Sequence, residues 1–228
     1  MYSELLKRYL LLIPGVFFVA LGIAFTTKSD LGTSPISAIP YTLSLIIPWI
    51  SYGKWTIMWN VLLVLSQLAM LRQKKELPQL SVQIVICFML GYFVDFCMWL
   101  LRGLNPVRYM MRIVVLIIGC MVLGVGVYTQ LKADVAMSPG DGHARVLTWF
   151  FKKDYSRTRI VQDMSFTVTA MVLSLLFLHG LKGAREGTVI ASFLVGFIVG
   201  LYKKAFDKPV DAFMKRFIIS NENSEKTL

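Results

Sequence analysis

Two copies of one polar pattern stand out in a chain that is otherwise strongly apolar. The pattern is Lys-x-Asp-x-x-x-Ser-Pro, and its members are Lys28, Asp30, Ser34 and Pro35 in the first copy and Lys132, Asp134, Ser138 and Pro139 in the second. Serine is a good N-cap and proline is favoured at the first helical position, so each Ser-Pro pair predicts the start of a helix. A helix N-terminus carries about half a positive elementary charge and free N–H groups. We therefore expect the two Ser-Pro pairs to bind an anionic group of a solute.

The charged members of the pattern have a second expected role. Lys28 and Lys132 would supply balancing positive charge, and Asp30 and Asp134 would pair with them or take a coupling cation or proton. The alternative is that both copies are only loop-to-helix boundaries, each with a local Lys–Asp pair at the surface.

The second copy continues into the densest polar cluster of the chain, Gly140-Asp141-Gly142-His143. A histidine can transfer protons near neutral pH, and glycine lets the backbone approach a ligand closely. We add Asp141 and His143 to the expected solute-binding residues. The alternative, a water-exposed loop, stays open.

Two further acids lie within apolar stretches, Asp95 and Asp163. A charge at the centre of a bilayer costs about 2.5–3.5 kcal/mol on insertion scales, so such residues are usually functional or paired. We predict an ion-coupling role for both. Asp95 could instead pair with Arg102 or Arg112, and Asp163 could pair with Arg159 one helical turn away.

The composition indicates a membrane protein. Of the 228 residues, 56% are hydrophobic and 16% are charged, against about 25% charged in a soluble domain. The net charge of +11 fits basic loops at the cytoplasmic face of a bilayer better than a nucleic-acid partner. The chain lacks P-loop, HExxH and GxSxG motifs and a metal-ligand spacing, so we expect no enzyme activity, no cofactor and no metal site.

Six stretches approach the roughly 20 apolar residues that a spanning helix needs. They are Leu10–Thr27, Trp55–Leu71, Leu80–Leu101, Met110–Leu131, Ile160–Leu178 and Gly187–Tyr202. A seventh stretch, Leu31–Ile50, contains three prolines, and each removes a backbone donor. We interpret it as a broken, re-entrant or interfacial segment packed within protein, although whether it spans or re-enters is left open.

The chain also resembles itself when it is shifted by 104 residues. The identities pair Gly15 with Gly119, Gly22 with Gly126, Lys28 with Lys132, Asp30 with Asp134, Ser34 with Ser138 and Pro35 with Pro139. Each copy holds three spans and one broken segment, in residues 1–105 and 106–205. Because three is odd, the copies would enter the membrane in opposite directions, as in many secondary transporters. The predicted fold is all-α, with six transmembrane helices as 3+3 inverted repeats and broken segments after spans one and four.

The distribution of basic residues predicts the orientation. With six spans, most of the 24 lysines and arginines fall in loops on the side of the termini. This bias places both termini in the cytoplasm. Residues 206–228 carry a helical apolar stripe and are expected to form an amphipathic helix on the inner leaflet.

Three short motifs suggest a family. They are Asp30-Leu31-Gly32-Thr33-Ser34-Pro35, the run Gly91-Tyr92-Phe93-Val94-Asp95, and Gly187-Thr188-Val189-Ile190 followed by Gly196. With these motifs the chain resembles the YczE/YyaS/YitT group of bacterial integral membrane proteins. It departs from that group at Ser34-Pro35-Ile36-Ser37, where members often carry a Gly-Pro-Trp-Asp-like sequence. The resemblance implies a bacterial inner-membrane location, and some members are linked to secondary-metabolite production.

Two functions follow as hypotheses. The favoured one is a secondary transporter of a small anionic or amphipathic solute that works by alternating access, with the lipid bilayer and an unknown solute as its partners. The other is a non-transporting accessory or scaffold protein that supports a biosynthetic or secretion process. Either one is compatible with a homo-oligomer.

Overall fold

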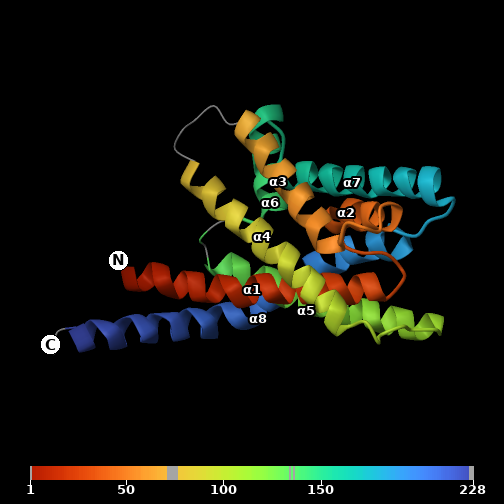
Figure 1. The fold of residues 1–228 in the computed structure, drawn as a ribbon. Helices are drawn as coiled ribbons and strands as arrows, with labels where there is room; N and C mark the ends of the chain where they lie inside the picture. The colour runs from red at the N-terminus through yellow and green to blue at the C-terminus, as the bar shows by residue number, and fades with distance from the viewer. Residues whose placement is uncertain (1, 71–76, 134, 136, 226–228) are drawn as a thin grey trace.

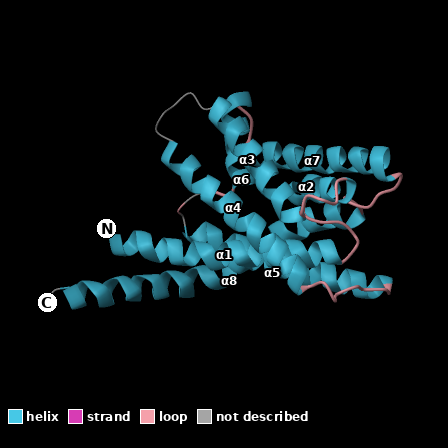
Figure 2. Cartoon of the chain, in the orientation of Figure 1, coloured by secondary structure: helices cyan, strands magenta, loops and turns pink. Residues whose placement is uncertain are grey.

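The computed structural model describes residues 2–70, 77–133, 135 and 137–225, and the side chains within 11–70, 79–133, 135 and 137–206. This part of the chain is helical, with loops between the helices and no strand (Figures 1 and 2). The helices are α1 (Tyr2–Lys28), α2 (Pro35–Ile46), α3 (Tyr52–Met70), α4 (Leu77–Leu100), α5 (Tyr109–Ala133), α6 (Pro139–Phe151), α7 (Tyr155–Leu178) and α8 (Glu186–Glu225). The predicted all-α class is confirmed.

Five of these helices are long and apolar enough to cross a membrane, namely α1, α4, α5, α7 and α8. Their membrane-length segments are Leu11–Lys28, Gln79–Leu100, Tyr109–Ala133, Tyr155–Leu178 and Glu186–Phe206. The sequence predicts a sixth at Trp55–Leu71, which corresponds to α3. That helix has 19 residues, but it falls outside the set because Lys54, Asn60 and Gln67 lower its hydropathy.

The centre of the bundle is the antiparallel pair of α1 and α5 (Figure 1). The pair packs closely because glycine removes side chains at the crossing. A Cβ added at Gly126 of α5 would overlap the backbone of Val19, and one added at Gly119 would lie 2.8 Å from Thr26 N. Val16 and Ala20 of α1 are fully buried in the resulting apolar core.

The two short helices, α2 and α6, begin where the Ser-Pro pairs predict. Pro35 and Pro139 are their first residues, after Ser34 and Ser138 at the N-caps. Helix α2 packs against α3 and α7, and α6 packs against α7 and α3. With 12 and 13 residues, neither helix is long enough to cross a bilayer alone.

The remaining contacts follow the same order in both halves, with one exception. Helix α1 packs against α4, as α5 packs against α8. In contrast, α3 and α4 lie against each other along much of their length, whereas α7 and α8 barely touch.

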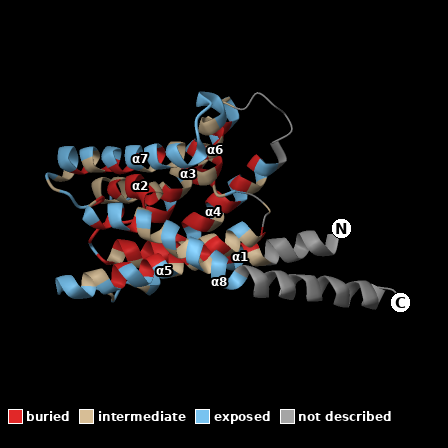
Figure 3. Ribbon diagram, turned by 180° about the vertical axis from the view of Figure 1, so that it is seen from behind, coloured by how far each residue is buried: buried red, intermediate tan, exposed pale blue. Residues whose placement is uncertain are grey.

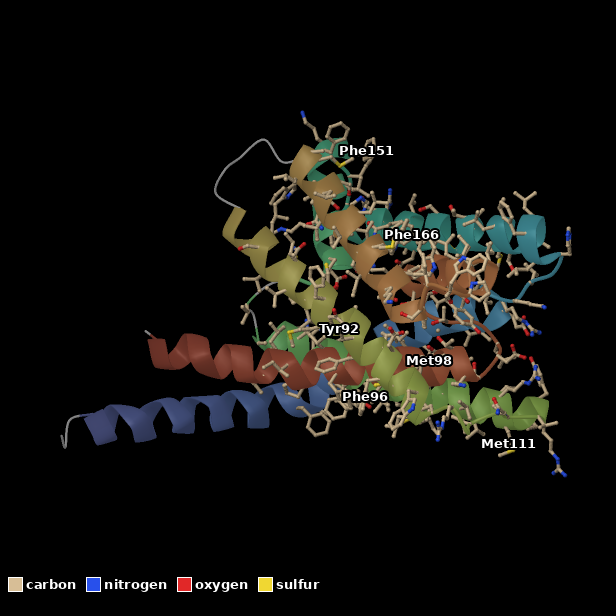
Figure 4. All side chains as sticks on the ribbon, in the orientation of Figure 1. Tyr92, Phe96, Met98, Met111, Phe151 and Phe166 are labelled. Carbon is tan, nitrogen blue, oxygen red and sulfur yellow. The ribbon has the colours of Figure 1, made fainter. Side chains whose placement is uncertain are left out.

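The surface carries many large apolar side chains, as expected of a lipid-facing bundle. Tyr92 and Phe96 on α4, labelled in Figure 4, are 67% and 49% exposed. Exposed residues dominate α7 and the part of α8 up to Phe206, whereas buried residues follow the inward faces of α1 and α2 (Figure 3). Only 6% of the membrane-length segment of α8 is buried, compared with 50% in α1.

Helix α8 continues beyond its membrane-length segment to Glu225 without a break. The apolar stripe predicted for residues 206–228 lies almost wholly among side chains outside the described residues. Both α1 and α8 extend toward the same end of the molecule (Figure 1).

Candidate functional site: the junction of two short helices

The first turns of α2 and α6 meet inside the bundle. A Cβ added at Gly140, the second residue of α6, would overlap Cδ1 of Ile36, the second residue of α2. Pro35 and Gly140 are both buried. The structure therefore brings together the two helix starts that the Ser-Pro pairs predict.

Glutamines from the neighbouring helices bond to the first turn of α6. Gln67 on α3 donates its Nε2 hydrogen to the carbonyl oxygen of Pro139 at 3.0 Å. Gln162 on α7 donates to the carbonyl oxygen of Gly140 at 3.1 Å. Both side chains are almost fully buried, 1% and 4% exposed. An amide in an apolar interior must be hydrogen-bonded to avoid a desolvation cost, so these bonds fix α6 between α3 and α7.

His143 belongs to the same network. Its Nδ1 lies 2.9 Å from Oε1 of Gln162, and its ring centroid lies 6.5 Å from that of Phe166. Burial lowers the pKa of His143, while the contact with Gln162 opposes this shift. Burial therefore favours the neutral form of the imidazole.

The predicted residues Asp141 and Asp163 share one arginine. Arg159 forms an ion pair with Asp141, and its Nε lies 3.2 Å from Oδ2 of Asp163 in the expected one-turn pair. Ser138 donates its hydroxyl to Oδ2 of Asp141 at 2.9 Å and caps α6 through Asp141 N. Arg159 thus joins the two acids beside the start of α6.

The first copy of the polar pattern is arranged differently. Ser34 is buried, and its hydroxyl donates to Oγ of Ser37 at 3.1 Å, so α2 has no side-chain cap. Lys28 ends α1 and Asp30 follows it, and both line a cavity of about 390 Å³. Asp30 has a left-handed backbone, with φ of 57°.

Asp30 is held by two arginines. Its Oδ2 lies 2.9 Å from Nη1 of Arg112 and 4.0 Å from Nη1 of Arg185. Its carbonyl oxygen also accepts a hydrogen bond from Arg185 at 3.1 Å. Lys28 makes no salt bridge to Asp30, so the predicted local Lys–Asp pair is wrong for this copy. In the second copy Lys132 lies in the last turn of α5, and Asp134 lies outside the described residues.

Asp95 holds two helices together. Its carboxylate accepts hydrogen bonds from Ser51 Oγ and from the backbone N–H of Gly53, both at 2.6 Å. The predicted pairing with Arg102 or Arg112 is wrong, because Arg112 bonds to Asp30 and Arg102 stacks over Trp99. The N-terminus of α3 attracts the carboxylate because its first N–H groups have no partner within the helix.

A second, much smaller cavity lies beside α6 toward the termini. Its volume of about 10 Å³ is close to the minimum for one water molecule. The lining includes Gln67, Gln83 and Arg145, and Oε1 of buried Gln83 has no hydrogen-bond partner among the described residues.

Three buried glutamines, Gln67, Gln83 and Gln162, were not predicted as part of the site. A signal for them exists, because polar amides are uncommon in spanning helices and usually bond between helices. Within the described part of the chain, no group of three or more His, Cys, Asp or Glu side chains could hold a metal ion.

A model of a family of unknown function (DUF6198) matches residues 6–204. The chain belongs to this family. Over 161 residues, which are 69% of this chain and 77% of the relative, it is 26% identical to a protein of Bacillus subtilis (strain 168) named "Uncharacterized protein YyaS". The expected resemblance to YyaS-type proteins is confirmed. No solved structure matches the chain.

Proposed function

We propose that this DUF6198 protein is a secondary transporter that moves a small anionic or amphipathic solute by alternating access. The observation that carries the proposal is the meeting of α2 and α6. Two helices too short to span begin next to each other in the bundle, between polar side chains that lipid cannot reach. Discontinuous helices that meet at a repeat interface are the usual solute sites of such transporters.

In this proposal the chain is a 3+3 inverted repeat, with α3 as the sixth membrane segment. The order of helix contacts supports it, because each packing partner of α2 has a counterpart around α6. The polar residues Asn60 and Gln67 of α3 are buried inside the protein, so they need not face lipid.

The two cavities support alternating access. The large cavity at Lys28 opens at the end away from the termini, while the cavity at Gln83 at the other end holds at most about one water. One open and one closed end is the arrangement expected of one state in a transport cycle.

We place the protein in the bacterial inner membrane with both termini in the cytoplasm. Helices α1 and α8 extend toward the same end of the molecule (Figure 1). The basic residues Lys152 and Lys153 lie between α6 and α7, and Arg157 lies in the first turn of α7. Positive charge in short loops marks the cytoplasmic side.

Reconstituted vesicles test the transport proposal. We expect uptake of an organic anion from a solute panel, with or without a proton gradient. Because Gln67 fixes the first turn of α6, Gln67→Leu should reduce the initial rate about tenfold or more. Ser192→Ala is the control, since its hydroxyl faces outward and bonds only to Val189 O among the described residues. A panel in which no solute exchanges would contradict the proposal.

The accessory function remains the second candidate because of one observation, the nearly uncovered α8. A partner protein that packs on α8 would explain that surface. Its test is co-purification with one defined partner, together with a cellular function that survives both Asp134→Asn and Asp163→Asn. Loss of function in these variants would favour transport.

A further inference from the structure

We propose that the cavity at the end of α1 is a binding site for a small organic monoanion with an apolar body. This assignment names the solute class of the proposed transporter and rests on that proposal for its biological meaning. The cavity volume of about 390 Å³ lies within the range of small-molecule pockets.

The charges that line the cavity favour an anion. Lys28 and Arg112 contribute two positive charges, and Asp30 is the one acid of the lining. Asp30 is already bonded to Arg112 and contacted by Arg185 from the start of α8. A cationic ligand would therefore have to compete with two guanidinium groups for one carboxylate.

Lys28 is available to a ligand. The ammonium group makes no hydrogen bond or ion pair with any described residue, and the side chain is half-buried at the cavity wall. A partly desolvated ammonium binds an opposite charge more strongly than one in bulk water, because the surrounding dielectric is lower.

Neutral donors complete the polar part of the site. Burial raises the pKa of Tyr41 to about 12, and the neighbouring Tyr52 and Asp30 add to this effect. The hydroxyl of Tyr41 therefore keeps its proton at neutral pH. Asn105 contributes an amide from the loop between α4 and α5.

The other wall of the cavity is apolar. Met98, labelled in Figure 4, comes from α4, and Pro106 and Val107 come from the loop that follows it. Val107 is 86% exposed, so this wall offers apolar surface that a bound alkyl or aryl group would cover. Cationic donors on one side and apolar surface on the other fit a carboxylate with a hydrocarbon body.

Three probes of equal size separate charge from shape. Hexanoate, hexanamide and hexylamine share a chain and differ in the head group. We expect hexanoate to bind the purified full chain in detergent, by equilibrium dialysis and by a raised melting temperature, and the other two to bind at least tenfold more weakly.

Substitutions in the cavity locate the binding. Lys28→Gln and Arg112→Gln should each weaken hexanoate binding about tenfold, the effect of losing one charged hydrogen bond. Lys28→Arg keeps the charge and should retain binding. Arg108→Gln is the matched control, because Arg108 is exposed at the same end of the molecule and is not part of the cavity lining.

Hexylamine binding as strong as hexanoate binding would overturn the site, and so would hexanoate binding unaffected by Lys28→Gln and Arg112→Gln. If Lys28→Gln does not fold, hexanoate binding is compared between Lys28→Arg and Arg112→Gln. Binding that is retained in Lys28→Arg and weakened in Arg112→Gln supports the site, and equal binding overturns it. Hexanoate binding in this cavity without uptake into vesicles would support the binding site and contradict the transport proposal. Uptake of a solute that does not bind in this cavity would support transport and contradict the binding site.

Discussion

The pair α3–α4 and the pair α7–α8 occupy corresponding places in the two halves, yet only the first is closely packed. Helix α7 begins with Tyr155 as α3 begins with Tyr52. The difference between the pairs lies in how the N-terminus of the first helix is capped.

In the first half the cap comes from the neighbouring helix. Asp95 on α4 accepts the N–H of Gly53 on α3 and so ties the two helices together. In the second half the cap is local, since Asp154 accepts the N–H groups of Ser156 and Arg157 at the start of its own helix. Gly200 stands on α8 where the proposed repeat aligns it with Asp95, and it has no carboxylate to offer.

Glycines show the same contrast. A Cβ at Gly53 would overlap the carbonyl oxygen of Gly91, so the two helices cross at the distance of backbone contact. Gly196, which aligns with Gly91, has no described atom within 4 Å of an added Cβ, and the same holds for Gly200. One sequence pattern thus has a closely packed and an open form in a single molecule.

The largest loss of stability should come from adding a side chain at Gly53, where α3 and α4 cross at the distance of backbone contact. Gly53→Val places new atoms against the backbone of α4, and we expect a loss of about 3 kcal/mol in the free energy of unfolding. The matched change Gly196→Val points into open space and should leave the melting temperature in detergent nearly unchanged. Equal losses in both variants would show that the two pairs do not differ in packing.

The next largest loss of stability should follow removal of the Asp95 carboxylate, which caps α3 from α4. Asp95→Ala loses two hydrogen bonds to a charged acceptor, and we expect about 2 kcal/mol of destabilisation. Asp154→Ala loses only a local cap, worth about 1 kcal/mol. Hydrogen exchange distinguishes the two variants, because only Asp95→Ala should raise exchange in both α3 and α4. Unchanged exchange in α4 would mean that Asp95 does not hold the pair.

The smallest effect concerns pH. His143 in α6 aligns with the buried Ile39 in α2, so in this pair of positions only the second half can titrate. Its pKa is lowered by burial, so below pH 6.5 the unfolded chain binds a proton that the folded chain resists. The melting temperature should be highest above pH 6.5 and fall as the pH drops toward the lowered pKa. His143→Gln should reduce this dependence. If the melting temperature of His143→Gln depends on pH as that of the unchanged protein does, His143 is not the group responsible.

Much of the helical framework could be predicted from the sequence. Proline at the first helical position identified the starts of α2 and α6, and apolar length identified five spans, because both signals are local. The partner of Asp95 could not be predicted, since it depends on which helix end α4 crosses. The cavity at Lys28 depends on the loop 101–108 folding back against α1, which no local pattern specifies. The three buried glutamines could have been noticed from the sequence. That Gln67 and Gln162 bond to the first turn of α6 depends on the tertiary arrangement of the helices, which no local pattern gives.

Labelling of two single cysteines tests the central claim most directly. In a variant without the native Cys87, Cys97 and Cys120, Asn105→Cys places a thiol in the large cavity and Met137→Cys places one at the small cavity. We predict that a membrane-impermeant maleimide labels Asn105→Cys in intact cells and labels Met137→Cys only after the cells are opened. If both positions react from the same side, α5 does not cross the membrane, and the 3+3 repeat and the transport proposal fail with it.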